Sequence, residues 1–326
     1  MSSATATPPT PAAAAAPATL AGPTAPAAPP ASFAASRAHR DTIFLEQATV
    51  LAQHHFAGDQ HVLRVAAPRC AERAEPGSFA HVQCSADLPM RRPMSIMRAN
   101  AQEGWVELLY KVVGSGSRAL ARLSTGASVS LLAPIGRGFS PHPERPRVLA
   151  LGGGVGIPPM IFLAERLLQA GPAWKPLVLM GSELPFPFRV RPSTMLMPGM
   201  PAEAIGCMPL LEEWGVPSRL ASLSGFPGCF EGYVTELARR WLAALDPSAR
   251  AEVEVFACGP TPMLAACARL AAEYALPCQV SLEEFMACAV GGCAGCAVAV
   301  RAADGSTAMK RVCVDGPVFE AQQVFP

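Results

Sequence analysis

Short β-favouring runs separated by turns fill the first part of the chain after residue 42. The segments 61–65 and 105–113 are rich in Val and Leu, and Gly58, Gly104 and Gly114 lie at their borders. No long helical pattern separates these runs. An antiparallel barrel or sandwich is therefore predicted from about residue 42 to residue 139.

The pattern changes after residue 147, where strand-like and helix-like segments alternate. The strand-like segments are 148–151, 177–180 and 253–256, and the helix-like ones are 160–169, 234–244 and 263–274. Such alternation predicts a parallel sheet with helical crossovers. The stretch 184–206 is rich in Pro and Met without clear periodicity, and we interpret it as an insertion or long loop.

The first 36 residues carry no charged side chain and are mostly Ala, Pro, Thr and Ser. Their prolines oppose a persistent helix, so a disordered tail is predicted over residues 1–38. A secretory signal would need a basic start and an unbroken apolar core, and this segment has neither. The uncharged stretch 148–164 contains four glycines and two prolines, which disfavours a membrane helix. We therefore expect a cytoplasmic protein.

Length and composition indicate several domains with ample cores. The 326 residues are 51% hydrophobic, and the net charge of +1 argues against a general nucleic-acid binder. We expect a multi-domain α and β protein, with a barrel domain over 39–142, an α/β parallel-sheet domain over 143–278 and a small unit over 279–326. Eleven irregularly spaced cysteines favour reduced thiols, some holding a metal, over a disulfide scaffold.

Four cysteines near the C-terminus have the spacing C-x4-C-x2-C-x16-C: Cys288, Cys293, Cys296 and Cys313. This spacing is close to the plant-type ligand pattern of a [2Fe–2S] cluster. Glycines between them allow the backbone to curl with its N–H groups facing the sulfides. A four-cysteine zinc site and a set of free thiols are the alternatives. The other seven cysteines show no ligand spacing and are expected to be mostly core thiols.

A glycine-rich segment follows the first strand of the α/β region and precedes a helix. Gly152, Gly153, Gly154 and Gly156 would let a pyrophosphate approach the helix N-terminus, although the strict G-x-G-x-x-G pattern is absent. A packing turn is the alternative interpretation. Farther along, Cys258, Gly259 and Pro260 end a strand at the carboxyl edge of the sheet, where ligands bind in such folds.

The barrel region contains two further candidate phosphate sites. Pro93 forces Arg92 into an extended backbone, which can aim the guanidinium at a phosphate, while Ser95 offers a hydroxyl. A surface turn is the alternative. Downstream, Tyr110 and Lys111 end a strand before the turn 114–117, which is rich in N–H groups.

Taken together, the Arg-Pro-x-Ser motif, the glycine-rich turn and Cys-Gly-Pro resemble the ferredoxin-reductase superfamily. Segments 281–288, 293–296 and 311–319 are similar to the electron-transfer subunit of the NAD-dependent, two-subunit dihydroorotate dehydrogenase. The resemblance covers about residues 42–325. It implies FAD on the barrel, NAD(H) on the α/β domain and a [2Fe–2S] cluster at the C-terminal end.

The resemblance also implies roles for individual positions. FAD contacts fall on Arg92, Pro93, Met94, Ser95, Leu109, Tyr110, Lys111, Gly116 and Ser117, and cluster ligands on Cys288, Cys293, Cys296 and Cys313. The chain departs from the family at Ala289, Phe285 and Ala133, and at 222–224, where serines replace an acidic stretch. NAD is favoured by the resemblance, whereas Arg219 could accept the 2′-phosphate of NADP.

A functional hypothesis follows from the implied cofactors. Electrons would pass from the FMN of a dihydroorotate dehydrogenase catalytic subunit, in a heterotetramer, through the cluster and FAD to NAD. This chain offers no candidate base for dihydroorotate, so substrate oxidation in pyrimidine biosynthesis would belong to the partner. One alternative is a ferredoxin- or hydrogenase-linked NAD(P)H oxidoreductase subunit. The other is a non-catalytic binding protein with a structural metal.

Overall fold

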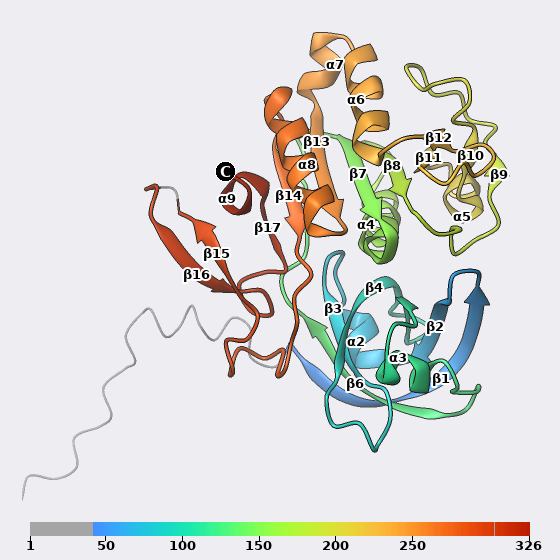
Figure 1. The fold of residues 1–326 in the computed structure, drawn as a ribbon, viewed down its shortest axis with the longest axis vertical. Coiled ribbons are helices and arrows are strands. Elements are labelled where there is room, and N and C mark those ends of the chain that lie inside the picture. Colours follow the sequence, from blue (N-terminus) through green and yellow to red (C-terminus); the bar gives the residue numbers. More distant parts are fainter. Residues whose placement is uncertain (1–41, 303) are drawn as a thin grey trace, which may run out of the picture. The chain divides into compact units, whose positions relative to one another are not determined.

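The computed structural model describes residues 42–302 and 304–326, and the tail expected over 1–38 lies outside the described residues. Six antiparallel strands close into a barrel in the order β1-β2-β5-β4-β3-β6, which confirms the predicted β architecture (Figure 1). The strands are β1 (Phe44–Phe56), β2 (Gln60–Ala66), β3 (Phe79–Gln83), β4 (Arg92–Asn100), β5 (Trp105–Lys111) and β6 (Ser128–Ile135). Two short helices, α2 (Pro68–Arg73) and α3 (Ser115–Leu120), connect them.

Side chains on β5 alternate between the barrel interior and the α/β region. Leu108 and Tyr110 are buried in the barrel core, whereas Leu109 is buried with residues of the sheet and α4. This is the period of two that an extended strand imposes.

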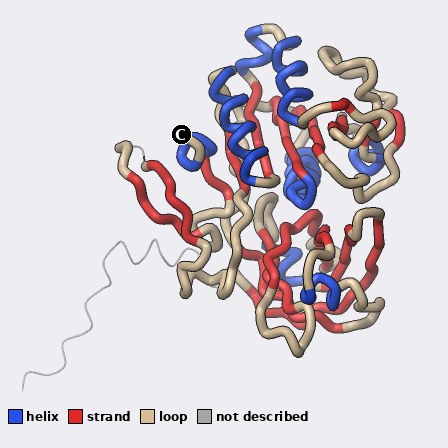
Figure 2. Tube along the Cα trace, in the orientation of Figure 1, coloured by secondary structure: helices blue, strands red, loops and turns tan. Residues whose placement is uncertain are grey.

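The α/β region is a largely parallel sheet flanked by helices, as the alternating pattern predicted (Figure 2). It has seven strands in the order β12-β11-β8-β7-β13-β14-β17. Its strands are parallel except β17, which is antiparallel to β14. In sheet order they are β12 (Phe230–Glu231), β11 (Ser218–Ser222), β8 (Lys175–Gly181), β7 (Arg147–Gly153), β13 (Val253–Cys258), β14 (Cys278–Ser281) and β17 (Val318–Glu320). The sheet thus continues beyond residue 278, where a separate C-terminal unit was expected to begin.

Helices cover both faces of this sheet. On β7, Leu149 and Leu151 are buried with the helices α6 and α8, whereas Val148 and Ala150 are buried with α4. Phe162 of α4 belongs to the barrel core, so α4 packs between the sheet and the barrel (Figure 1). The helices are α4 (Ile157–Ala170), α5 (Pro209–Glu213), α6 (Val234–Ala244), α7 (Pro247–Ala251), α8 (Thr261–Glu273) and α9 (Ala321–Val324), and the 3-10 turn η1 (Gly154–Gly156) precedes α4.

Two small elements complete the described chain. The stretch 184–206 is the predicted long loop, with only β9 (Arg191–Pro192) pairing with β10 (Gly206–Cys207). After the cysteine-rich segment, β15 (Ala297–Arg301) and β16 (Thr307–Arg311) form a two-stranded hairpin. Over 42–302 and 304–326, no helix has both the length and the apolar character needed to span a membrane.

Candidate functional site

The four cysteines of the C-terminal motif are grouped as two pairs. The Sγ atoms of Cys296 and Cys313 lie 3.4 Å apart, and the N–H of Cys293 donates to Sγ of Cys288 at 3.4 Å. Within the described residues, no three Cys, His, Asp or Glu side chains converge on one metal position. A [2Fe–2S] cluster has two irons, each needing two protein ligands. The adjacent thiols of Cys296 and Cys313, with Cys288 and Cys293 linked through a backbone N–H, fit the two-plus-two ligands of a two-iron cluster better than a single zinc ion.

The backbone around these cysteines bends through unusual conformations. Gly291 has a φ of +81°, and a Cβ on it would lie 2.6 Å from Cγ2 of Val314. Ala289 and Ala294 also have positive φ, at +56° and +55°. The Ala289 departure from the family thus places a side chain on a left-handed backbone position. The sharp bends turn successive N–H groups toward the sulfurs, as in the donation from Gly295 to Sγ of Cys293.

The two pairs differ in their thiol acidity. Burial opposes ionisation of Cys288, but backbone N–H groups that include Val290 and Cys293 outweigh it and lower its pKa to about 7. Burial and the neighbouring Cys296 thiol raise the pKa of Cys313 to about 12. Cys293 is exposed, whereas Cys296 and Cys313 are buried. The seven remaining cysteines are all buried, as expected for core thiols.

The glycine-rich turn and the Cys-Gly-Pro segment lie against each other at the carboxyl edge of the sheet. A Cβ on Gly156 would lie 2.3 Å from the carbonyl oxygen of Cys258, and one on Gly153 would lie 3.3 Å from Cδ of Pro260. The close packing at Gly156 and Gly153 therefore requires glycine whether or not a ligand binds there. Gly154 is different, because its φ is +54° and no atom lies within 4 Å of its Cβ position. Of the four glycines, Gly154 thus leaves open space for a ligand.

Two ionisable side chains lie near each other beside this turn: the thiol of Cys258, which is buried, and the carboxylate of Glu283, which is exposed. Burial and the charge of Glu283 raise the pKa of the Cys258 thiol, which is hydrogen-bonded to Ser281. Surrounding protein raises the pKa of Glu283, although its side chain is in contact with solvent. The sequence placed Glu283 in a family-like segment, but nothing in it distinguished this carboxylate from Glu284. Only the fold brings Glu283 near Cys258.

The candidate flavin residues of the barrel come from two adjacent segments. The Arg92 side chain packs on Gly116, where a Cβ would lie 3.2 Å from Nε. Arg92 donates from Nη1 to the carbonyls of Met90 and Arg91, and its Nε and Nη2 have no hydrogen-bond partner among the described residues. A guanidinium with free donors beside a bare glycine fits an anionic group such as a phosphate.

The other candidate flavin positions are more enclosed. The hydroxyl of Ser117 accepts from the N–H groups of Val113 and Gly114, so it caps its own helix α3. The Tyr110 hydroxyl donates to Gln53, and its ring stacks on His61 inside the barrel wall. Met94 and Leu109 are buried, Pro93 and Ser95 are partly exposed, and Lys111 is exposed. FAD contacts at these positions stay a prediction.

The structure contradicts one alternative for the nucleotide, a contact of Arg219 with the 2′-phosphate of NADP. Arg219 is only 5% exposed, and its guanidinium donates to the carbonyls of Ser218 and Met195. It fastens the 184–206 loop to β11 and is not available to a 2′-phosphate. At the end of β11, the Ser222 hydroxyl accepts from the N–H of Ser224.

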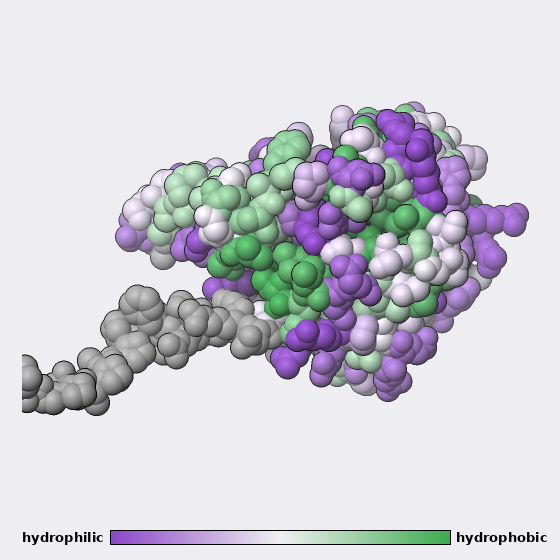
Figure 3. Space-filling model, turned by 90° about the horizontal axis from the view of Figure 1, so that it is seen from below, coloured by the Kyte–Doolittle hydropathy of each residue, from purple (hydrophilic) through white to green (hydrophobic). Residues whose placement is uncertain are grey.

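Exposed apolar side chains lie next to Cys288 in the sequence. Phe285 is 93% exposed and Val290 is 50% exposed. A space-filling view shows a hydrophobic area on the face of the molecule that is seen from below (Figure 3). Large apolar side chains on a surface are typical of an interaction site when they gather in one area.

Comparison with known proteins agrees with this arrangement. The family model described as the iron-sulfur cluster binding domain of dihydroorotate dehydrogenase B matches residues 283–325. The electron transfer subunit of dihydroorotate dehydrogenase B (NAD+) from Desulforamulus reducens is 32% identical over 283 residues, covering 85% of this chain and 97% of the relative. Its counterpart from Caldanaerobacter subterraneus is 32% identical over 254 residues, covering 78% and 88%.

Solved structures share the fold. An NADH-dependent reduced ferredoxin-NADP oxidoreductase superposes with a TM-score of 0.68 at 24% identity, covering 86% of this chain and 90% of that one. Phthalate dioxygenase reductase superposes with a TM-score of 0.52 at 16% identity, covering 82% and 76%. These matches confirm the ferredoxin-reductase-like architecture. The sequence relatives establish that the chain belongs to the family of dihydroorotate dehydrogenase B (NAD+) electron transfer subunits.

Proposed function

We propose that this chain carries electrons between NAD(H) and a catalytic partner subunit that oxidises dihydroorotate. When bound, FAD exchanges a hydride with nicotinamide and single electrons with a [2Fe–2S] cluster, which links two-electron and one-electron chemistry. The paired cysteines at 288/293 and 296/313, inside the region that the iron-sulfur family model matches, carry the proposal.

The residues divide the work by region. The barrel over 39–142 would hold FAD, with Arg92 and Gly116 at its phosphates, and the region 143–278 would hold NAD(H). The segment 279–326 would hold the cluster. The open position at Gly154, beside Cys258, Gly259 and Pro260, supports a dinucleotide at the carboxyl edge of the sheet.

The partner is proposed to be an FMN-containing catalytic subunit in a heterotetramer. Exposed Phe285 and Val290, on either side of Cys288, support docking of a protein close to the cluster. A cytoplasmic location is supported by the seven cysteines outside the motif, which are buried thiols that form no disulfide.

Anaerobic purification tests the cofactor content. The protein should carry flavin and cluster absorbance, with iron and sulfide and no zinc. Cys293→Ser should remove the cluster absorbance and leave the flavin bound, because the flavin positions lie on the barrel. Cys229→Ser, a buried thiol outside the motif, is the matched control and should keep both. Zinc without iron in the wild type would contradict the assignment.

Activity assays test the division of labour. The isolated chain should oxidise NADH with an artificial acceptor and show no activity towards dihydroorotate. With an FMN-bearing catalytic subunit, it should support NAD reduction by dihydroorotate. Oxidation of dihydroorotate by the isolated chain at a comparable rate would overturn the scheme.

A further inference from the structure

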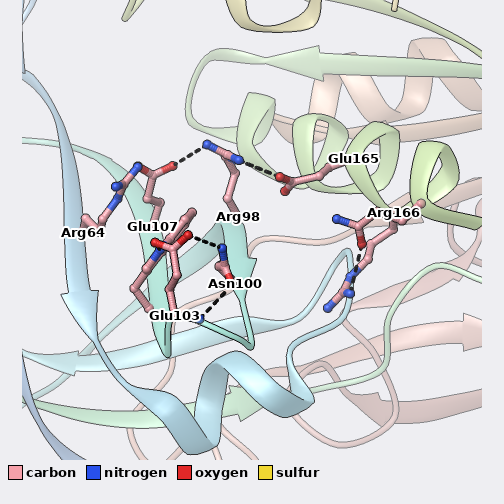
Figure 4. Close-up of polar contacts among 9 residues, drawn as sticks. Arg64, Arg98, Asn100, Glu103, Glu107, Glu165 and Arg166 are labelled. Atoms are coloured by element: carbon pink, nitrogen blue, oxygen red, sulfur yellow. Dashed lines mark hydrogen bonds and ion pairs between the residues drawn. The ribbon is translucent and has the colours of Figure 1, made fainter. Parts of the chain in front are cut away.

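One arginine joins the barrel to the α/β region. Arg98 on β4 donates from Nε and Nη2 to Oε1 of Glu165 on α4, at 3.1 and 2.7 Å (Figure 4). The two side chains are only 19% and 13% exposed. A charge-assisted contact of this kind, largely withdrawn from water, is stronger and more directional than a surface ion pair.

The same guanidinium touches residues of both regions. It lies 4.9 Å from the ring of Trp214, which follows α5, and 5.3 Å from the ring of Trp105 on β5. Its Nη1 also lies 3.8 Å from Oε2 of Glu107. Arg98 therefore contacts α4 and the residue after α5 in the α/β region, and two side chains of the neighbouring barrel strand.

Glu165 depends on this arginine for its charge compensation. Its Oε2 is buried and has no hydrogen-bond partner within the described chain. A buried carboxylate is costly unless a cation balances it, and Arg98 is the cation that contacts it. The pair therefore resists separation of β4 from α4.

Both elements that this contact joins begin at a candidate cofactor segment. β4 starts with Arg92, Pro93, Met94 and Ser95, the proposed flavin positions, and carries Arg98 four residues after Met94. α4 starts directly after the turn 154–156 and carries Glu165 two turns later. A strand and a helix are stiff, so fixing them at one point constrains the distance between the segments at their ends.

We propose that Arg98 is a positioning residue, which sets the flavin-binding strand against the nucleotide-binding helix through Glu165. The inference rests on the proposed function, because its consequence is the alignment of nicotinamide with flavin. The proposed role is to align the two cofactors and not to bind them, since neither Arg98 nor Glu165 is a proposed cofactor contact. Small misalignments of reacting groups lower rates steeply.

The test compares Arg98→Lys and Glu165→Gln with Arg64→Lys. Arg64 is a matched control, because it also stacks on Trp105, at 4.1 Å, and pairs with Glu107, yet these contacts stay within the barrel. In rapid mixing with saturating NADH, Arg98→Lys and Glu165→Gln should slow flavin bleaching about tenfold. Flavin content and the Kd for NADH should change less than about twofold, and Arg64→Lys should match the wild type.

A second readout needs no cofactor. In thermal unfolding of the flavin-free protein, the effects of Arg98→Lys and Glu165→Gln should be non-additive, because each change alone weakens the same contact. Additive effects, or an unchanged bleaching rate in Arg98→Lys with flavin bound, would overturn the proposal. Absence of flavin bleaching by NADH in the wild type would instead contradict the proposed function, and the unfolding cycle would still decide whether the pair couples the two elements.

Discussion

Single backbone positions set the shape of the cysteine loop. An L-residue in the left-handed region costs about 1–2 kcal/mol, and the loop accepts this at Ala289 and Ala294. Other contacts hold the bends, including the donation from the Arg311 side chain to the carbonyl of Gly291 at 2.9 Å. The N–H groups that surround Cys288 are a consequence of these bends.

Gly291→Ala should damage this loop more than a neighbouring change. The new Cβ would meet Val314 at 2.6 Å on a left-handed backbone, whereas one on Gly292 would find only Sγ of Cys288, at 4.0 Å. We expect Gly291→Ala to lower the iron content of purified protein and the unfolding free energy by more than about 1 kcal/mol. Gly292→Ala should retain iron, and equal loss in both variants would contradict this account.

Among the elements, the turn between β7 and α4 has a packing role and a proposed role in nucleotide binding. Gly156 is fixed by the Cys258 carbonyl, and Gly153 lies against the Pro260 side chain. A substitution at either position would therefore disturb the fold whether or not a nucleotide binds. Gly154 separates the two roles, because its Cβ position is open.

Gly154→Ala tests nucleotide binding with little cost to the fold. Its stability should fall by about 1 kcal/mol, the cost of the left-handed backbone. If the turn approaches a pyrophosphate, the Kd for NADH should rise about tenfold or more, as loss of a charge-assisted hydrogen bond implies. Gly215→Ala, with a φ of +74° and open space two residues after α5, is the matched control. An unchanged Kd for NADH in Gly154→Ala would mean that the turn serves packing only and does not bind the nucleotide.

The sequence predicted elements well and contacts between them poorly. Periodicity identified α6 over Val234–Ala244 and three of the seven strands of the sheet, β7, β8 and β13, because burial on one or both faces leaves a local pattern. The sequence pattern did not predict that Arg219 is buried or that β14 and β17 lie side by side. These facts depend on long-range packing, which no local pattern records. The Arg98–Glu165 pair was missed for the same reason.

In the molecule as a whole, the segment after the barrel is tied to the sheet by a polar network. Ser140 exchanges hydrogen bonds with the Gln279 side chain, and Nδ1 of His142 lies 2.9 Å from Oε1 of Glu254. Glu254 is fully buried on β13. Hydrogen bonding and the charge of Glu254 raise the pKa of His142 above its usual 6.5, with smaller contributions from Glu144 and Glu320.

This network should make stability depend on pH. Folding raises the pKa of His142. The contribution of His142 to the free energy of unfolding is therefore complete below about pH 6.5, and it is lost as the pH rises through the raised pKa of the folded protein. Burial and the charge of Glu254 raise the pKa of Glu320, so the contribution of Glu320 to the free energy of unfolding also falls as the pH rises. Urea unfolding of the wild type and His142→Gln should differ more at about pH 6 than at about pH 8. An equal difference at both pH values would contradict the role of the pair.

The neighbouring positions of β14 and β17 have a consequence for how the family could have acquired its iron–sulfur segment. Ser281 pairs with Val318, and the N–H of Leu282 donates to the carbonyl of Pro317 at 2.9 Å. The chain therefore leaves the sheet at the end of β14 and returns to it at the start of β17, the neighbouring antiparallel strand. An exchange of residues 283–316 at this point would keep the pairing of β14 with β17, and the incoming segment would have to replace buried side chains such as Met286, Val300 and Val312 in the core beside the sheet.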